Sequence, residues 1–130
     1  MPPTLTLELD RVAGPLEAAE DMASDARYNK ILITTEIPDG ALCESLSCAL
    51  ILAGGRVRGV AGQFRLRAIG YGYSGDNAYT LGALDKAGRM LDQLGVSPGV
   101  VEPFKHAPPG RSACVSHNML ASLSLVTERE

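Results

Sequence analysis

The sequence predicts an α+β fold, organised as a single compact domain over residues 1–130. Apolar residues alternate with polar ones in some segments and recur every three to four residues in others, and Gly or Pro separates the two kinds. A chain of 130 residues is long enough to close one hydrophobic core. We expect a mixed or antiparallel sheet of about four to five strands with three helices, in the order β-α-β-α-β-α-β-β.

The N-terminal part predicts a strand, a helix and a second strand. Leu5, Leu7 and Leu9 alternate with polar residues, as in a strand with one solvated face. A helix is expected from about residue 16 to 27, with its acidic residues, Glu20 among them, largely on the solvent side. The β-branched segment 30–37 predicts the second strand.

The stretch 41–53 is apolar nearly all round and predicts a second helix, with Asp39 as its cap. Because it lacks a charged face, we expect it to be buried between the sheet and another layer, for which a second subunit is one candidate. Extended chain is expected over 56–69, with a bulge or tight hairpin at Gly59 and Gly62.

The C-terminal half predicts one helix and two further extended segments. Leucines at helical spacing indicate a helix from about Asn77 to Leu94, which Gly95 ends. A short extended piece is expected over 100–104, and a last strand over 118–127.

Composition excludes several classes of partner. The net charge is −3 and the basic residues are scattered, so nucleic acid is not an expected partner. No apolar run is long enough to cross a bilayer and the first residues do not resemble a signal peptide, so we expect no membrane contact and a cytoplasmic protein. The three cysteines are then expected to be buried thiols, at least one of them free.

The stretch "AIGYGYSGDN" contains a G-x-G-x-x-G pattern between an expected strand and an expected helix. A dinucleotide site is disfavoured because arginines occupy the preceding strand and Asp76 stands where phosphate would bind. Either the glycines only supply turns, or the amides near Gly72 bind a small carboxylate or carbonyl compound. In the second case four neighbours contribute side chains: Tyr71, Tyr73, Ser74 and Arg67.

Two further clusters could carry chemistry. Cys114 precedes His117 by three residues and could form a thiol and base pair if the backbone turns there. Lys105 and His106 follow a strand end, where binding groups are common. Cys43 and Cys48 are expected on one helix, pointing in different directions, and no C-x-x-C occurs. No metal site and no cofactor are predicted.

Residues 69–101, "IGYGYSGDNAYTLGALDKAGRMLDQLGVSPGVV", resemble the second half of the tautomerase superfamily in their strand, glycine, helix and "SP" order. The resemblance implies trimers and an N-terminal proline that acts as a base, which would be Pro2 after removal of Met1. The first half departs from that pattern, because the apolar helix over 41–53 has no counterpart.

The function predicted from the sequence is therefore the binding of a small carboxylate or carbonyl metabolite by a homo-oligomer, a dimer or trimer. Catalysis would be proton transfer of the isomerase or lyase type, with His117, Cys114 or Pro2 moving the proton. A non-catalytic assembly or regulatory module and a tautomerase-like enzyme that uses Pro2 remain as alternatives.

Overall fold

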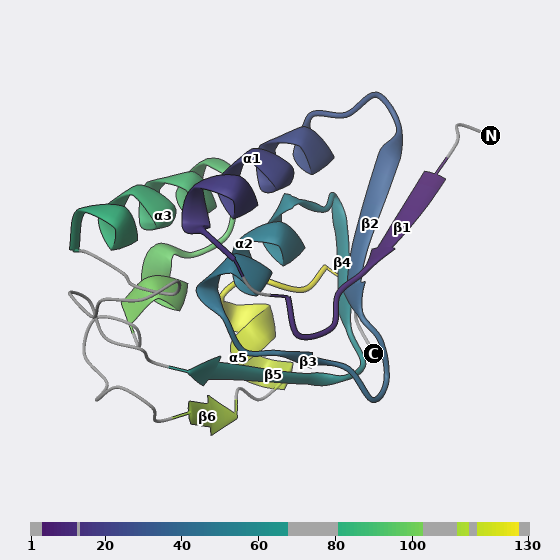
Figure 1. Cartoon of the computed structure of the whole chain (residues 1–130). Coiled ribbons are helices and arrows are strands. Elements are labelled where there is room, and N and C mark those ends of the chain that lie inside the picture. Colours follow the sequence, from purple (N-terminus) through teal and green to yellow (C-terminus); the bar gives the residue numbers. More distant parts are fainter. Residues whose placement is uncertain (1–3, 13, 68–80, 103–111, 115–116, 128–130) are drawn as a thin grey trace.

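The computed structural model describes residues 4–12, 14–67, 81–102, 112–114 and 117–127, with the backbone alone described for 66, 67, 112–114 and 117. The α+β class predicted from the sequence is confirmed (Figure 1). The elements are β1 Thr4–Glu8, α1 Leu16–Arg27, β2 Leu32–Ile37, β3 Leu42–Cys43, α2 Leu46–Gly54, β4 Val57–Val60, β5 Gln63–Arg67, α3 Leu81–Gln93, η1 Pro98–Val101 (a 3-10 helix), β6 Ser112–Cys114 and α5 His117–Ser122.

The described strands form two small sheets of three strands each. The first has the order β1-β2-β4 and is parallel throughout. The second has the order β3-β5-β6, in which β3 and β5 are parallel and β5 and β6 antiparallel. Figure 1 shows the first sheet on one side of the molecule and the second below the helices. The single sheet expected from the sequence is therefore divided in two.

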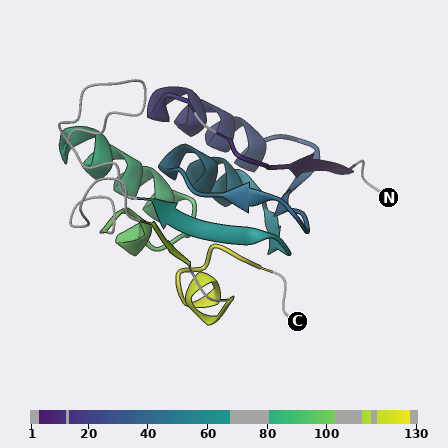
Figure 2. The same ribbon diagram turned by 60° about the horizontal axis from the view of Figure 1, so that its bottom comes forward.

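Helix α2 lies at the centre of the core, as both views show (Figures 1 and 2). Every residue from Leu46 to Gly54 is buried, and the helix packs against α1, α3 and β2. As expected for a helix without a charged face, α2 is therefore buried. The covering layers belong to the same chain, so this helix is not available as a subunit interface.

Helix α1 has the bounds that the periodicity predicts, Leu16–Arg27. Ala19, Ala23 and Ala26 face the core, where small side chains let α1 approach α2 closely. One residue departs from the expected pattern. Glu20 is buried instead of facing solvent, because it lies on the side of α1 that meets α3.

The prediction of a helix starting at Ala41 with Asp39 as its cap was wrong. Leu42 and Cys43 form β3, and α2 begins only at Leu46. Its N-cap is Ser45, whose Oγ accepts a hydrogen bond from the Cys48 amide at 2.9 Å. Serine caps a helix by satisfying an amide of its first turn, and the sequence offers Ser45 as well as Asp39 for that role.

Extended chain over 56–69 is confirmed for β4 and β5, but these strands do not form a hairpin. β4 pairs with β2, whereas β5 pairs with β3 and β6, so the chain changes sheet at residues 61 and 62. Gly62 allows this crossing, since a Cβ there would collide with the carbonyl oxygens of Pro38 and Ala41.

Two expected extended segments are helical. Residues 98–101 form η1, which Ser97 caps through its Oγ and the Gly99 amide. Residues 117–122 form α5 where a strand was expected. Helix α3 and its end at Gly95, with φ of +79°, agree with the prediction over the described residues. Within the described part of the chain, no helix is long and apolar enough to span a bilayer.

Candidate functional site

Most of the residues predicted to form a site lie outside the described part of the chain. These are Pro2, Tyr71, Gly72, Tyr73, Ser74, Lys105 and His106. For the other three, the backbone is described. Arg67 ends β5, Cys114 ends β6 and His117 begins α5.

The β5–β6 ladder brings the ends of two predicted binding segments together. Arg67 pairs with Ser112 and Arg65 pairs with Cys114 in an antiparallel register. Directly opposed residues in such a ladder have Cα atoms about 5 Å apart. Arg67 and Ser112, the described residues that come directly before 68–80 and directly after 103–111 along the chain, are therefore neighbours. Cys114, at the other end of β6, pairs with Arg65, and His117 begins α5 three residues further along the chain.

Arg65 is the member of this region that the sequence prediction missed. Its Nε atom is buried and has no hydrogen-bond partner among the described residues. Buried donors are nearly always paired in folded proteins, and each exception calls for an explanation. The alternation of Gln63, Arg65 and Arg67 against buried Phe64 was the available signal, and it singles out Arg65 as readily as Arg67.

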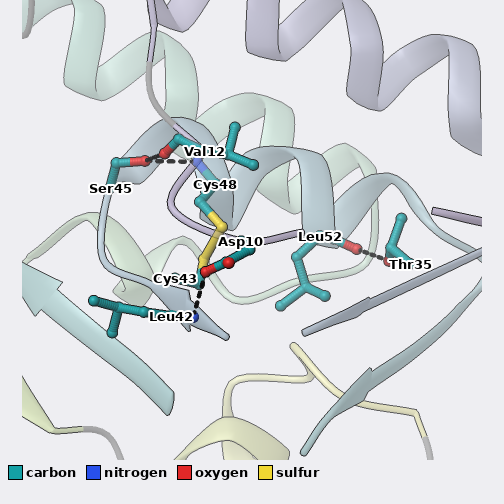
Figure 3. Close-up of a disulfide and its surroundings, with 8 residues drawn as sticks. All are labelled: Asp10, Val12, Thr35, Leu42, Cys43, Ser45, Cys48 and Leu52. Carbon is teal, nitrogen blue, oxygen red and sulfur yellow. Dashed lines mark hydrogen bonds between the residues drawn. A yellow bond between two sulfur atoms is a disulfide. The ribbon is translucent and has the colours of Figure 1, made fainter. Parts of the chain in front are cut away.

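Cys43 and Cys48 form a disulfide, which corrects the prediction that they are free thiols pointing apart (Figure 3). Cys43 lies in β3 and Cys48 in the first turn of α2, and their Cα atoms are 5.8 Å apart. Both residues are completely buried. The prediction failed because it placed both cysteines on one helix, whereas the turn at residues 44 and 45 folds β3 back onto α2.

The segment closed by this disulfide also holds the connection between β1 and α1 (Figure 3). Asp10 Oδ1 accepts a hydrogen bond from the Leu42 amide at 3.1 Å, and Ser45 Oγ donates to the Val12 carbonyl at 2.6 Å. Ser47 Oγ donates to the Gly14 carbonyl at 2.7 Å. These three side chains form hydrogen bonds with backbone groups of the protein itself, so we assign the disulfide region a structural role.

Two arginines, Arg58 buried and Arg27 half-buried, donate to carbonyls at the ends of helices. Arg27 donates to the carbonyls of Ala53, Gly54 and Leu94, and so caps both α2 and the α3 terminus. Arg58 donates to the carbonyls of Gly55, Ser124 and Leu125. Burial lowers the pKa of Arg58 to about 10, with a further decrease from Arg27, and burial likewise lowers the pKa of Arg27. Because their guanidinium N–H groups donate to backbone carbonyls, both arginines stabilise the fold.

A solvent-open groove of about 600 Å³ runs between α3 and η1. Its lining comprises Leu84, Asp85, Gly88, Arg89, Asp92, Gln93, Pro98, Val101 and Glu102.

The sequence matches no protein-family model and no curated protein. Solved structures do share its fold. Two mutants of 1510-N, a membrane-bound stomatin-specific protease, align with TM-scores of 0.66 and 0.65 at 16% sequence identity, in each case over 95% of this chain. One carries a serine-to-alanine substitution; the other carries a lysine-to-alanine substitution and is in complex with a substrate peptide.

The chain covers 62% and 58% of the length of these two proteins. At 16% identity the likeness establishes the fold and leaves the chemistry to be argued from this chain's own residues. The described part of the chain thus shares its fold with the protease 1510-N.

Proposed function

We propose that the chain binds a small ligand bearing a carbonyl or carboxylate group beside the β5–β6 ladder and catalyses proton transfer on it. The observation that carries the proposal is the buried Nε–H of Arg65, which has no partner within the described residues. A donor left in this state raises the free energy of the ligand-free protein. A ligand oxygen that accepts its hydrogen would relieve that cost, and charge-assisted bonds of this kind are the stronger ones.

The register of β5 and β6 supports the same location. Segments 68–80 and 103–111 meet the described fold beside Arg67, two residues along β5 from Arg65. In the proposed scheme Tyr71, Tyr73 and Ser74 orient the ligand on the amides near Gly72. Arg65, Arg67 and Lys105 neutralise charge that develops on its oxygen.

The proton would be taken from the carbon beside the carbonyl by one of three groups, Cys114, His117 or Pro2. Cys114 is directly opposite Arg65 in the ladder, which makes it the first of these to test. A non-catalytic regulatory module and a tautomerase-like use of Pro2 are the competing proposals. The non-catalytic module predicts no proton exchange by wild type, and the use of Pro2 predicts that Cys114→Ser exchanges protons as fast as wild type.

A peptide is the second candidate ligand. The observation that favours it is the shared fold with a protease that has been solved with a substrate peptide. A peptide carbonyl could accept the same Arg65 hydrogen bond, and the reaction would then be hydrolysis of an amide instead of proton transfer to carbon. Titration with 2-oxo acids and with short peptides separates the two candidates.

The test compares wild type with Arg65→Met by calorimetric titration with small carboxylates, 2-oxo acids and short peptides. Loss of one charge-assisted hydrogen bond should weaken binding roughly ten- to a hundredfold. Met keeps the apolar stem and lacks the unpaired donor, so the variant should fold at least as stably as wild type. Lys30→Met, at an exposed position, is the matched control and should bind as wild type does.

Equal binding by wild type and Arg65→Met would remove the proposal. Catalysis has its own readout. If the chain transfers protons, the signal of the hydrogen beside the carbonyl of a 2-oxo acid should disappear in D₂O, as followed by NMR. If the ligand binds and this exchange does not occur, the protein binds the ligand without catalysis, and the proposed enzyme activity is wrong.

Self-association is proposed at the edge of β1. This strand ends the parallel sheet, Leu5 is 54% exposed, and alternate backbone groups of an edge strand lack partners within their own sheet. A dimer or trimer formed by this edge would cover Leu5. Leu5→Lys should then shift the protein to monomer in analytical ultracentrifugation.

We also propose that the protein acts in the cytoplasm. Thiols are mostly reduced there, and the complete burial of Cys43 and Cys48 would protect their disulfide. Recovery of the chain from cytoplasm with this bond intact would support that location.

A further inference from the structure

We infer that the contact between α1 and the first half of α3 is a proton-controlled switch, which is closed while the Glu20 carboxyl carries a proton and opens locally when that carboxyl ionises. The inference does not depend on the proposed function. It rests on the enclosure of Glu20 between the two helices, which lie side by side (Figure 1), and on the contacts that hold the second half of α3.

Glu20 is enclosed where α1 meets α3. Its side chain is 7% exposed, and its Oε2 atom is buried with no hydrogen-bond partner within the described residues. Its Oε1 atom lies 3.8 Å from Lys86 Nζ, which is longer than a hydrogen bond. An ionised carboxylate in such a place lacks the water and donors that stabilise its charge, whereas a protonated carboxyl remains there at lower cost.

The charged groups that act on Glu20 do not offset this enclosure. Within the described residues they are the ammonium of Lys86 on α3 and the carboxylates of Glu17 and Asp21 on α1. Helix α2 adds no ionisable group, because its one cysteine is in the disulfide. Burial raises the pKa of Glu20, Lys86 lowers it, and the two neighbouring carboxylates raise it further. Ionisation would thus add a third negative charge to this part of α1.

The second half of α3 is held by contacts that the proton on Glu20 does not change. Arg27 Nη1 donates to the Leu94 carbonyl at 2.6 Å, which ties the residue after α3 to α1. Gly88 lies against η1, since a Cβ there would be 3.6 Å from Pro98 Cβ. A glycine inside a helix also lowers helix stability by about 1 kcal/mol relative to alanine. We therefore expect opening over residues 81–87, with Gly88 as the hinge.

The effect of pH follows from the two states of Glu20. In the open form the carboxyl reaches water and loses its proton near the ordinary value of 4.5, whereas the closed form holds the proton to higher pH. Closure is therefore fully favoured below 4.5, and this advantage is lost as pH rises through the pKa of the closed form. Between the two pKa values the equilibrium constant for opening should increase by up to about tenfold per pH unit.

Amide hydrogen exchange of the full chain, followed by NMR at a series of pH and urea concentrations, tests the switch. Amides of residues 85–87 report on α3, and amides of residues 49–53 in the buried α2 report on global unfolding. After correction for the intrinsic rate, we expect residues 85–87 to open at least about tenfold more often than residues 49–53 and with little dependence on urea. Equal exchange and equal urea dependence at both places would overturn the inference, because opening would then be global.

Three variants identify the proton. Glu20→Gln should remove the pH dependence of opening at residues 85–87, and Asp25→Asn, at an exposed position of α1, should retain it. Lys86→Met removes the cation that favours ionisation, so opening should continue to increase up to a higher pH than in wild type. The same pH dependence in Glu20→Gln and wild type would assign the proton to another group and overturn the inference.

Discussion

Among the described residues Glu20 and Arg58 are buried and Arg27 is half-buried, and the two arginines are paired differently from the glutamate. Arg27 and Arg58 direct their donors at backbone carbonyls of helix and loop ends. Glu20 has one carboxylate oxygen 3.8 Å from Lys86 Nζ, while its Oε2 is buried with no partner among the described residues. Burial raises the pKa of Glu20, with Lys86 acting in the opposite direction and Glu17 and Asp21 adding to the increase.

This raised pKa makes folding stability depend on pH. The unfolded chain loses the Glu20 proton near the ordinary value of 4.5, whereas the folded protein holds it to higher pH. The stabilising contribution is therefore complete below 4.5 and is lost as pH rises through the folded pKa. Glu20→Gln removes this dependence. We expect the free energy of unfolding of Glu20→Gln, relative to wild type, to increase between about pH 4 and pH 7.

Urea unfolding at a series of pH values measures this difference. Glu8→Gln, at an exposed position of β1, is the control and should follow wild type at each pH. A constant difference between Glu20→Gln and wild type would mean that Glu20 has its ordinary pKa in the folded protein.

At the scale of the elements, the contact between α1 and α2 depends on small residues. Gly54, the last residue of α2, lies against the backbone of Ala23 on α1. A Cβ on Gly54 would lie 2.6 Å from both Ala23 Cα and its carbonyl oxygen, which is too close for any side chain. The backbone of α1 is not free to retreat, because Arg27 ties its last turn to the carbonyls at the end of α2.

Alanine substitutions at two helical glycines should therefore have opposite effects. Gly54→Ala must separate the helices and should lower the free energy of unfolding by about 1–3 kcal/mol. Gly82, in the first turn of α3, has no atom of the described residues within 4 Å of its would-be Cβ, so Gly82→Ala should raise stability by about 0.5–1 kcal/mol through better helix propensity. Thermal and urea unfolding of the two variants measure both values. Equal effects at the two sites would contradict the close packing of α1 on α2.

At the scale of the whole molecule, the disulfide joins parts that the two sheets keep separate. Cys43 belongs to the β3-β5-β6 sheet, whereas Cys48 lies in α2, which packs on β2 of the other sheet. The same segment holds the β1–α1 connection through Leu42, Ser45 and Ser47. The bond therefore links the smaller sheet, the central helix and the N-terminal connection.

Replacing both bonded cysteines by alanine tests this role. Closing so short a loop restricts the unfolded chain by about 2 kcal/mol, so Cys43→Ala with Cys48→Ala should lower the melting temperature by roughly 5–10 °C. Cys114→Ala retains the bonded pair and is the matched control. An unchanged melting temperature in the double variant would show that the bond adds no stability. Mass measurement without reductant checks that the bond is present in wild type.

The sequence predicted best the elements that are decided by interactions between residues close together in the chain. The limits of α1, the strands near Leu5 and Ile33, and the burial of α2 were predictable, because side-chain periodicity over one element specifies them. The strand expected over 118–127 was wrong, since alternation of Met119, Ala121 and Leu123 over so few residues also fits a short helix.

The candidate site stays a prediction, because most of its residues lie outside the described part of the chain. The sequence indicated the glycine segment and the loop before β6, but it could not show that the two meet the fold at the pairing of Arg67 with Ser112. The sequence also could not show that Arg65 Nε has no hydrogen-bond partner among the described residues, or that a groove lies beside Gly88. Both depend on how separate elements pack.

By itself, the sequence determined the α+β class, the position of the main helices and the central, buried character of α2. The tertiary structure decided which strands pair, that Cys43 and Cys48 bond, that α2 is covered by its own chain, and that Glu20 is enclosed. The physical reason is the distance along the chain. Periodicity and capping act between residues a few positions apart, whereas pairing, cross-linking and desolvation depend on residues that only folding brings into contact.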